Sequence, residues 1–106
     1  MTDEELNLRA ALAAFSDEKG RIHAGDANKF DPLHSGDDLV RLLIATGISF
    51  HRPSHAVIVA WTGDHSVEVE IQDGDELATA ARAACELAAS WVDDDVVGEW
   101  KRRRGA

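Results

Sequence analysis

The stretch AVIVAW, residues 56–61, is apolar at every position. Successive side chains of a β-strand point to opposite faces of the sheet, so both faces of this strand are apolar. One face carries Val57, Val59 and Trp61, and the other carries Ala56, Ile58 and Ala60. A strand of this kind is typical of the centre of a sheet, with a further layer covering each face. The stretch therefore predicts a central strand that other elements cover on both sides.

The segments on either side of this stretch predict its two neighbours in an antiparallel sheet. Beyond a turn at residues 62–65, residues 66–72 (SVEVEIQ) alternate strictly between polar and apolar positions, which is typical of a half-exposed strand. Before the stretch, residues 48–50 (ISF) begin a strand. Pro53, at the second position of a turn over residues 52–55, pre-sets the backbone angle that a tight turn needs. The sequence thus predicts three antiparallel strands joined by two hairpins.

Three segments with helical spacing flank the predicted strands. Thr2 and Glu5 form a capping box for a first helix. Ser35 caps a second helix, which ends at Gly47, the residue type that most often stops a helix in a left-handed conformation. Asp75 is the candidate cap of a third, alanine-rich helix. These signals predict three helices and their boundaries.

The predicted fold is α+β, a three-stranded antiparallel sheet packed by helices in the order α-α-β-β-β-α, in one domain over residues 1–106. Residues 16–34 form a long loop. Residues 93–106 either form a short C-terminal helix or remain a loose tail. The second and third helices are expected to cover the sheet face that carries Ile48, Phe50, Val57, Val59, Trp61, Val67, Val69 and Ile71.

The opposite face of the predicted sheet requires a cover of its own. Either the first helix or a second copy of the chain lies on it. With a second copy there, the chain is a structural or accessory protein that acts through homodimerisation. The residues expected to make that contact are Ala56, Ile58, Ala60 and Trp100.

The chain is strongly acidic. Its formal charge is −9, with twenty acidic and eleven basic residues, and four of the basic residues lie in residues 101–104. The rest of the chain therefore carries twenty acidic and seven basic residues, a formal charge of −13. Such a charge disfavours direct binding of nucleic acid and favours encounter with a basic protein surface. The alternative explanation is that the acidity only keeps a small domain soluble.

Two acidic clusters are the candidate sites for a basic partner. Carboxylates on a strand or helix surface stand about 5 to 6 Å apart, close enough to imitate a row of phosphates. An acidic protein of this kind can occupy the lysines and arginines with which another protein binds nucleic acid. The clusters consist of Glu68, Glu70, Asp73, Asp75 and Glu76, and of Asp93, Asp94 and Asp95.

No motif for catalysis or metal binding stands out in the sequence. Phosphate-binding glycine loops and nucleophile elbows are missing, and Cys85 has no neighbouring base. His51 and His55 have the spacing of a zinc-binding helix, but Pro53 between them predicts a turn, and two ligands seldom hold zinc. The other histidines, at spacings that do not complete a site, are His23, His34 and His65. We therefore expect no enzyme activity, no metal site and no cofactor.

The bulk features of the chain favour the cytoplasm as its location. No apolar run approaches the roughly 20 residues that a membrane span requires. The N-terminal residues are acidic where a secretory signal would be basic and then apolar, and a single cysteine cannot form an internal disulfide.

The segment from about residue 37 to residue 91 resembles the small phage-encoded proteins called ABA-sandwich domains. The resemblance rests on the helix that leads to GISF (residues 47–50), the strand pair that ends in EVEIQ (68–72), and the helix LATAARAACELA (77–88). It covers about half of the chain and brings no functional motif. The resemblance implies a phage protein, and with it an inhibitor that occupies the basic, nucleic-acid-binding surface of a host defence complex.

Overall fold

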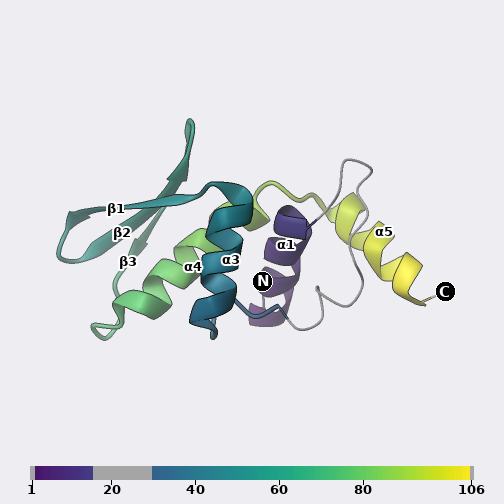
Figure 1. The fold of residues 1–106 in the computed structure, drawn as a ribbon, viewed down its shortest axis with the longest axis horizontal. Helices are drawn as coiled ribbons and strands as arrows, with labels where there is room; N and C mark the ends of the chain where they lie inside the picture. Colours follow the sequence, from purple (N-terminus) through teal and green to yellow (C-terminus); the bar gives the residue numbers. More distant parts are fainter. Residues whose placement is uncertain (1, 16–29, 106) are drawn as a thin grey trace.

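The computed structural model describes residues 2–15 and 30–105. This part of the chain contains four helices and one three-stranded antiparallel sheet in the order α-α-β-β-β-α-α (Figure 1), which confirms the predicted α+β fold. The elements are α1 (Asp3–Phe15), α3 (Gly36–Thr46), β1 (Ser49–Ser54), β2 (Val57–Thr62), β3 (His65–Glu70), α4 (Glu76–Ala89) and α5 (Asp94–Gly105). Residues 16–29, most of the loop predicted over residues 16–34, lie outside the described residues.

The first three helices begin where the local sequence predicts. The side chains of Thr2, Ser35 and Asp75 each accept a hydrogen bond from the backbone N–H three residues later, at 3.1, 3.3 and 3.0 Å. α3 ends at Gly47, whose φ of 74° is left-handed and is adopted by glycine without strain. Each of these signals acts within four residues, so no tertiary contact is needed to place it. None of the helices in residues 2–15 and 30–105 has the length and apolar character of a membrane span.

β2 is the central strand of the sheet, as predicted, with β1 and β3 at the two edges. Gly63 and Asp64 form a two-residue loop between β2 and β3, and the positive φ of Gly63, 56°, suits the first position of such a loop. A two-residue loop pairs each odd-numbered residue of β2 with an even-numbered residue of β3, such as Val59 with Glu68. This register decides which side chains share a face.

The covered face of the sheet carries the even-numbered residues of β2. Phe50 of β1 and Val67 of β3 pair with Ala60, and Val69 pairs with Ile58. Ala60 is fully buried and Ile58 is 7% exposed, because α4 runs along this face and contacts β2 and β3 (Figure 1). The prediction that Ile58 and Ala60 lie on the outer face is therefore wrong. That prediction placed the odd-numbered residues of β2 and β3 on the same face. The two-residue loop instead pairs odd-numbered residues of β2 with even-numbered residues of β3.

The opposite face carries Val57, Val59 and Trp61, which were predicted to lie under the helices. Val57 and Val59 are half-buried, and Trp61 is 43% exposed. α1 and α3 pack mainly against α4 and against each other, so among the described residues no helix covers this face (Figure 1). The expected cover of this face by the second and third helices is thus wrong, and within the described residues the apolar central strand is covered on one side only.

β1 continues through Pro53 to Ser54, so the turn predicted over residues 52–55 is misplaced. Ser54 still pairs with β2, and the loop consists of residues 55–56. The register of β1 shifts between His51 and Ser54, as at a β-bulge. On an edge strand a proline at a bulge removes no hydrogen bond from the ladder, which is why the strand tolerates it.

The core lies where α4 meets the sheet, α1 and α3. Most of the residues that α4 buries are small, so the backbones of its neighbours approach closely. These residues are Thr79, Ala81, Ala83, Ala84, Cys85, Leu87, Ala88 and Ala89. Leu77 near the start of α4 and Trp91 just after its end lie outside this buried surface, because they are 64% and 39% exposed.

The C-terminal segment forms a helix of twelve residues rather than a loose tail. Asp93 caps it by accepting the backbone N–H three residues later at 2.9 Å. Val97 is buried with Leu12 of α1 and with Val92, and Trp100 is half-buried against this cluster. Trp100, predicted to contact a second copy of the chain, therefore packs against a cluster of its own chain.

Arg9 of α1 holds the connection between α4 and α5. It is 9% exposed and donates from Nη1 to the carbonyl oxygen of Val92 at 2.9 Å. Nη2 donates to the carboxylate of Asp94 and to Oε1 of Glu5, the latter at 3.3 Å. These carboxylates, Asp94 first, raise the pKa of Arg9, so its charge is secured in a nearly buried position.

The two faces of β2 predict different effects for the same kind of substitution. Ile58→Thr removes buried methyl groups and buries a hydroxyl, so we expect it to lower the free energy of unfolding by about 2 to 3 kcal/mol. Val59→Thr keeps the branched shape on the open face, and we expect a loss of about 1 kcal/mol or less. Urea unfolding followed by tryptophan fluorescence measures both. Equal losses would contradict the face assignment.

Removal of the Arg9 side-chain charge should loosen α5. Arg9→Met keeps the apolar stem but leaves the carbonyl of Val92 without its donor, so we expect a loss of about 1 to 3 kcal/mol and faster proteolysis at residues 90–94. Arg82→Met is the matched control, because Arg82 is 44% exposed and pairs with Asp3 at 2.8 Å on the surface. We expect the control to cost about 1 kcal/mol at most. A control as damaging as Arg9→Met would show that burial of Arg9 is not the cause.

Candidate functional site

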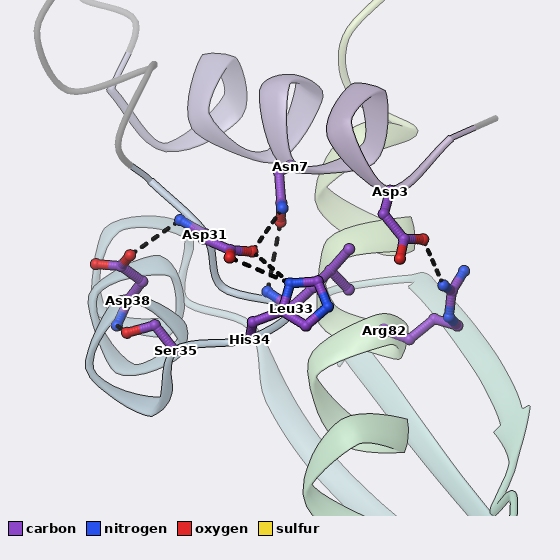
Figure 2. Close-up of polar contacts among 8 residues, drawn as sticks. All are labelled: Asp3, Asn7, Asp31, Leu33, His34, Ser35, Asp38 and Arg82. Atoms are coloured by element: carbon purple, nitrogen blue, oxygen red, sulfur yellow. Dashed lines mark hydrogen bonds and ion pairs between the residues drawn. The ribbon is translucent and has the colours of Figure 1, made fainter.

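A polar network surrounds Asp31, just before α3 (Figure 2). Asn7 of α1 donates from Nδ2 to Oδ1 of Asp31 at 2.7 Å and accepts the backbone N–H of Leu33 at 3.4 Å. The backbone N–H of Asp31 donates to Oδ2 of Asp38 in α3 at 2.9 Å. The network therefore fastens this segment to α1 and to α3 at once.

His34 and Asp31 form an acid–histidine pair within this network (Figure 2). Nδ1 of His34 lies 3.0 and 3.1 Å from the two carboxylate oxygens. Such a pair activates a nucleophile when a hydroxyl or thiol contacts the other ring nitrogen. In the described part of the chain no such group contacts it, and the His34 side chain is 65% exposed. The geometry supports a structural role for the pair rather than catalysis.

Cys85 is fully buried in α4. Burial disfavours the charged thiolate and raises the pKa of this thiol to about 12. The thiol is therefore protonated at neutral pH and out of reach of a substrate. Cys85 therefore packs as a small core residue.

The larger of two described cavities, about 560 Å³, lies between α1 and α4. Its lining residues are Leu6, Arg9, Arg82, Glu86, Ala89, Ser90 and Val92. Both arginines already have carboxylate partners, since Arg82 lies 2.8 Å from Asp3 and 3.8 Å from Glu86. With its cations neutralised from within the chain, the cavity has no charge left to select an anion.

The smaller cavity, about 250 Å³, lies between α3 and the start of α4. It is lined by Pro32, Leu33, His34, Ser35, Gly36, Leu39, Asp75, Leu77, Ala78 and Ala81. The polar side chains in this wall are occupied, because Ser35 and Asp75 cap α3 and α4 and His34 contacts Asp31. The cavity therefore offers a small, mostly apolar surface whose named polar side chains already have partners within the chain.

The histidines of the described residues do not converge on a metal site. Within residues 2–15 and 30–105, no group of three histidine, cysteine, aspartate or glutamate side chains is placed to hold a metal ion. His51 lies on β1 and His55 in the loop that follows, and both are exposed. His23, which was weighed as a ligand with them, lies outside the described residues.

Four of the eight acidic residues predicted to bind a partner act within the chain. Asp75 and Asp93 cap α4 and α5. Glu76 forms an ion pair of 3.0 Å with an arginine of β1, and Asp94 pairs with the buried arginine of α1. These four carboxylates have structural partners, which makes them weaker candidates for a partner surface.

The other four are Glu68, Glu70, Asp73 and Asp95, and their carboxylates form no hydrogen bond or ion pair with another described residue. Asp73 lies in the turn after β3, with a left-handed φ of 52°. Asp95 lies in α5, at the opposite end of the molecule from the sheet (Figure 1). The two predicted acidic clusters therefore do not form one site, and only Glu68 and Glu70 stand side by side on one strand face.

Glu68 and Glu70 lie on the uncovered face of the sheet, next to its apolar centre. Val59 pairs with Glu68 on one side and with His51 on the other, and Val57 pairs with Glu70. We call this surface the open sheet face. It consists of Ser49, His51, Val57, Val59, Trp61, Ser66, Glu68 and Glu70. It combines an apolar row on β2 with two carboxylates on β3, and it is the candidate site.

Sequence reasoning found the two glutamates of this site and missed its apolar row. Val57, Val59 and Trp61 were expected to lie in the core. The signal that identifies them is the two-residue loop at residues 63–64, because it places the odd-numbered residues of β2 beside the even-numbered glutamates of β3.

Comparison with known proteins brings no relative. No model of a known protein family matches the sequence, and neither a curated protein nor a solved structure matches the chain. The resemblance to phage-encoded ABA-sandwich domains therefore stays a prediction.

The buried thiol predicts a pH dependence of stability. In the unfolded chain Cys85 titrates near its ordinary pKa of 9.0, and in the folded chain near about 12. Below pH 9 the thiol is protonated in both states, so its raised pKa leaves the free energy of unfolding unchanged. As pH rises from 9 to 12, only the unfolded chain releases the proton, and the free energy of unfolding falls. The difference between wild type and Cys85→Ala should have a slope of about 1.4 kcal/mol per pH unit in this window. Urea unfolding at pH 8 to 11 measures it, and parallel curves would contradict burial of the thiol.

Proposed function

We propose that the protein is a non-catalytic binding module that engages a basic protein surface through its open sheet face. The observation that carries this proposal is the position of Glu68 and Glu70. Both are exposed, neither has a cationic partner among the described residues, and both adjoin half-buried valines of β2. A surface of this composition suits a partner that offers both cations and apolar side chains.

The two parts of the open sheet face contribute differently to binding. The carboxylates attract a basic surface and speed its encounter with the chain, an effect that salt weakens. The apolar row of Val57, Val59 and Trp61 supplies surface that a partner removes from water, and tryptophan is enriched where interfaces are tightest. Charge therefore selects the partner and apolar burial holds it.

Proteins that bind nucleic acid are the class of partner that fits this chemistry. Their lysines and arginines are arranged to meet rows of phosphates, and a pair of carboxylates on one strand face presents a similar row of negative charge. The formal charge of −9 supports the same class, because it opposes direct contact with nucleic acid. In a phage protein this activity would inhibit a host defence complex by occupying its nucleic-acid-binding surface.

The alternative function, homodimerisation through Ala56, Ile58, Ala60 and Trp100, has less support. Ile58 and Ala60 are buried on the side of α4, and Trp100 is half-buried against the cluster of Leu12, Val92 and Val97. Only Ala56 remains exposed, and a single alanine does not make an interface.

The proposal is tested by reversing the charge of the two glutamates. We expect Glu68→Lys/Glu70→Lys to weaken binding of fluorescein-labelled decalysine about tenfold at low ionic strength, because both attractive contacts become repulsive. Glu4→Lys/Asp95→Lys is the matched control, since it changes the net charge equally at exposed positions away from the sheet. Fluorescence anisotropy gives both dissociation constants. Equal weakening by the two variants would mean that net charge alone, and not the open sheet face, attracts the cations.

A further inference from the structure

The outer edge of β3 presents unpaired backbone groups. In the part of the chain that the structure describes, the sheet order is β1-β2-β3, so no strand pairs with this edge. The N–H of Ile71 donates to the carbonyl oxygen of Ala56 at 2.7 Å, so the backbone of Ile71 faces β2. Hydrogen-bonding direction alternates along an antiparallel strand. The N–H and C=O groups of Ser66, Glu68 and Glu70 therefore point outward.

The side chains along this edge differ on the two faces of the sheet. Glu68 and Glu70 project onto the open sheet face, where both are exposed. Val67 and Val69 project toward α4 and remain half-buried, so each leaves apolar surface uncovered. A strand added here would meet two carboxylates on one face and two valines on the other.

We propose that the partner binds as an extended basic segment that adds a fourth strand to the outer edge of β3. Its lysines or arginines stand at alternate positions opposite Glu68 and Glu70, and an apolar residue between them covers the valine side. Alternate residues of any strand lie about 7 Å apart, so the spacing of the cations matches that of the glutamates. This inference rests on the proposed function and adds to it the form in which the partner binds.

A second copy of the chain fits this edge less well than a basic segment does. Two β3 strands related by a two-fold axis would place the glutamates of both copies on the same face, and like charges opposite each other destabilise a strand pair. The other edge of the sheet, β1, carries Pro53 and a shift in register, which interrupt a ladder. Charge and edge geometry thus both favour a partner of opposite charge.

The test uses the full chain and three synthetic peptides of the sequence Lys-Val-Lys-Val-Lys, acetylated and amidated at their ends. One peptide is unmodified, one is N-methylated on the backbone nitrogens of its lysines, and one on those of its valines. All three carry the same charge. In an added strand only one of these two sets of N–H groups faces β3, so a methyl group blocks pairing in one peptide and points to solvent in the other.

We expect one N-methylated peptide to bind about tenfold more weakly than the unmodified peptide and the other to bind equally well, because only one loses its hydrogen bonds to the edge. The unmodified peptide should also slow amide exchange at Ser66, Glu68 and Glu70 in nuclear magnetic resonance spectra. Glu68→Gln/Glu70→Gln should weaken all peptides that bind.

The outcomes separate this inference from the proposed function. Equal binding by all three peptides, lost in Glu68→Gln/Glu70→Gln, would overturn strand addition and leave the acidic binding surface standing. Binding that is unchanged in Glu68→Gln/Glu70→Gln would overturn both strand addition and the proposed function. Protection of the same amides that grows with protein concentration in the absence of peptide would show that a second copy occupies the edge, and would also overturn the inference.

Discussion

The close packing of α4 against three neighbours is the constraint on which the rest of the fold depends. α4 contacts the sheet on one side and α1 and α3 on the others. Its buried surface consists mostly of alanines, so three sets of backbone approach the helix without large side chains between them. The side chains of such a core are small, so its stability comes from the close fit between elements rather than from the burial of a few large residues.

The same arrangement leaves one face of the sheet without a helix. Because α1 and α3 pack on α4, among the described residues no helix is available for the far side of β2, and Trp61 is 43% exposed there. An apolar row in this position would favour aggregation, and the carboxylates of Glu68 and Glu70 along the adjacent edge oppose it. In the proposed function the same two carboxylates select a basic partner.

Several buried or partly buried polar contacts join a helix to a distant segment of the chain. Arg9 fixes the connection before α5, and Asp31 joins α1 to α3 through Asn7 and Asp38. In these pairs the partners lie far apart in sequence, except for Asp31 and Asp38. Local sequence patterns therefore did not predict them, and the acid–histidine pair at Asp31 and His34 is understood only once its surroundings are known.

Sequence by itself determined the fold class, the central strand and the starts of the first three helices, because caps such as Ser35 act within about four residues, as does the left-handed Gly47 that ends α3. The glutamates of the open sheet face were also identifiable, since strict alternation marks a half-exposed strand. Only the tertiary structure decided which face of β2 the helices cover, and therefore that Val59 and not Ile58 lies beside Glu68. Both faces of that strand are apolar, so composition could not distinguish them, and the choice followed from strand register and from the side on which α4 packs.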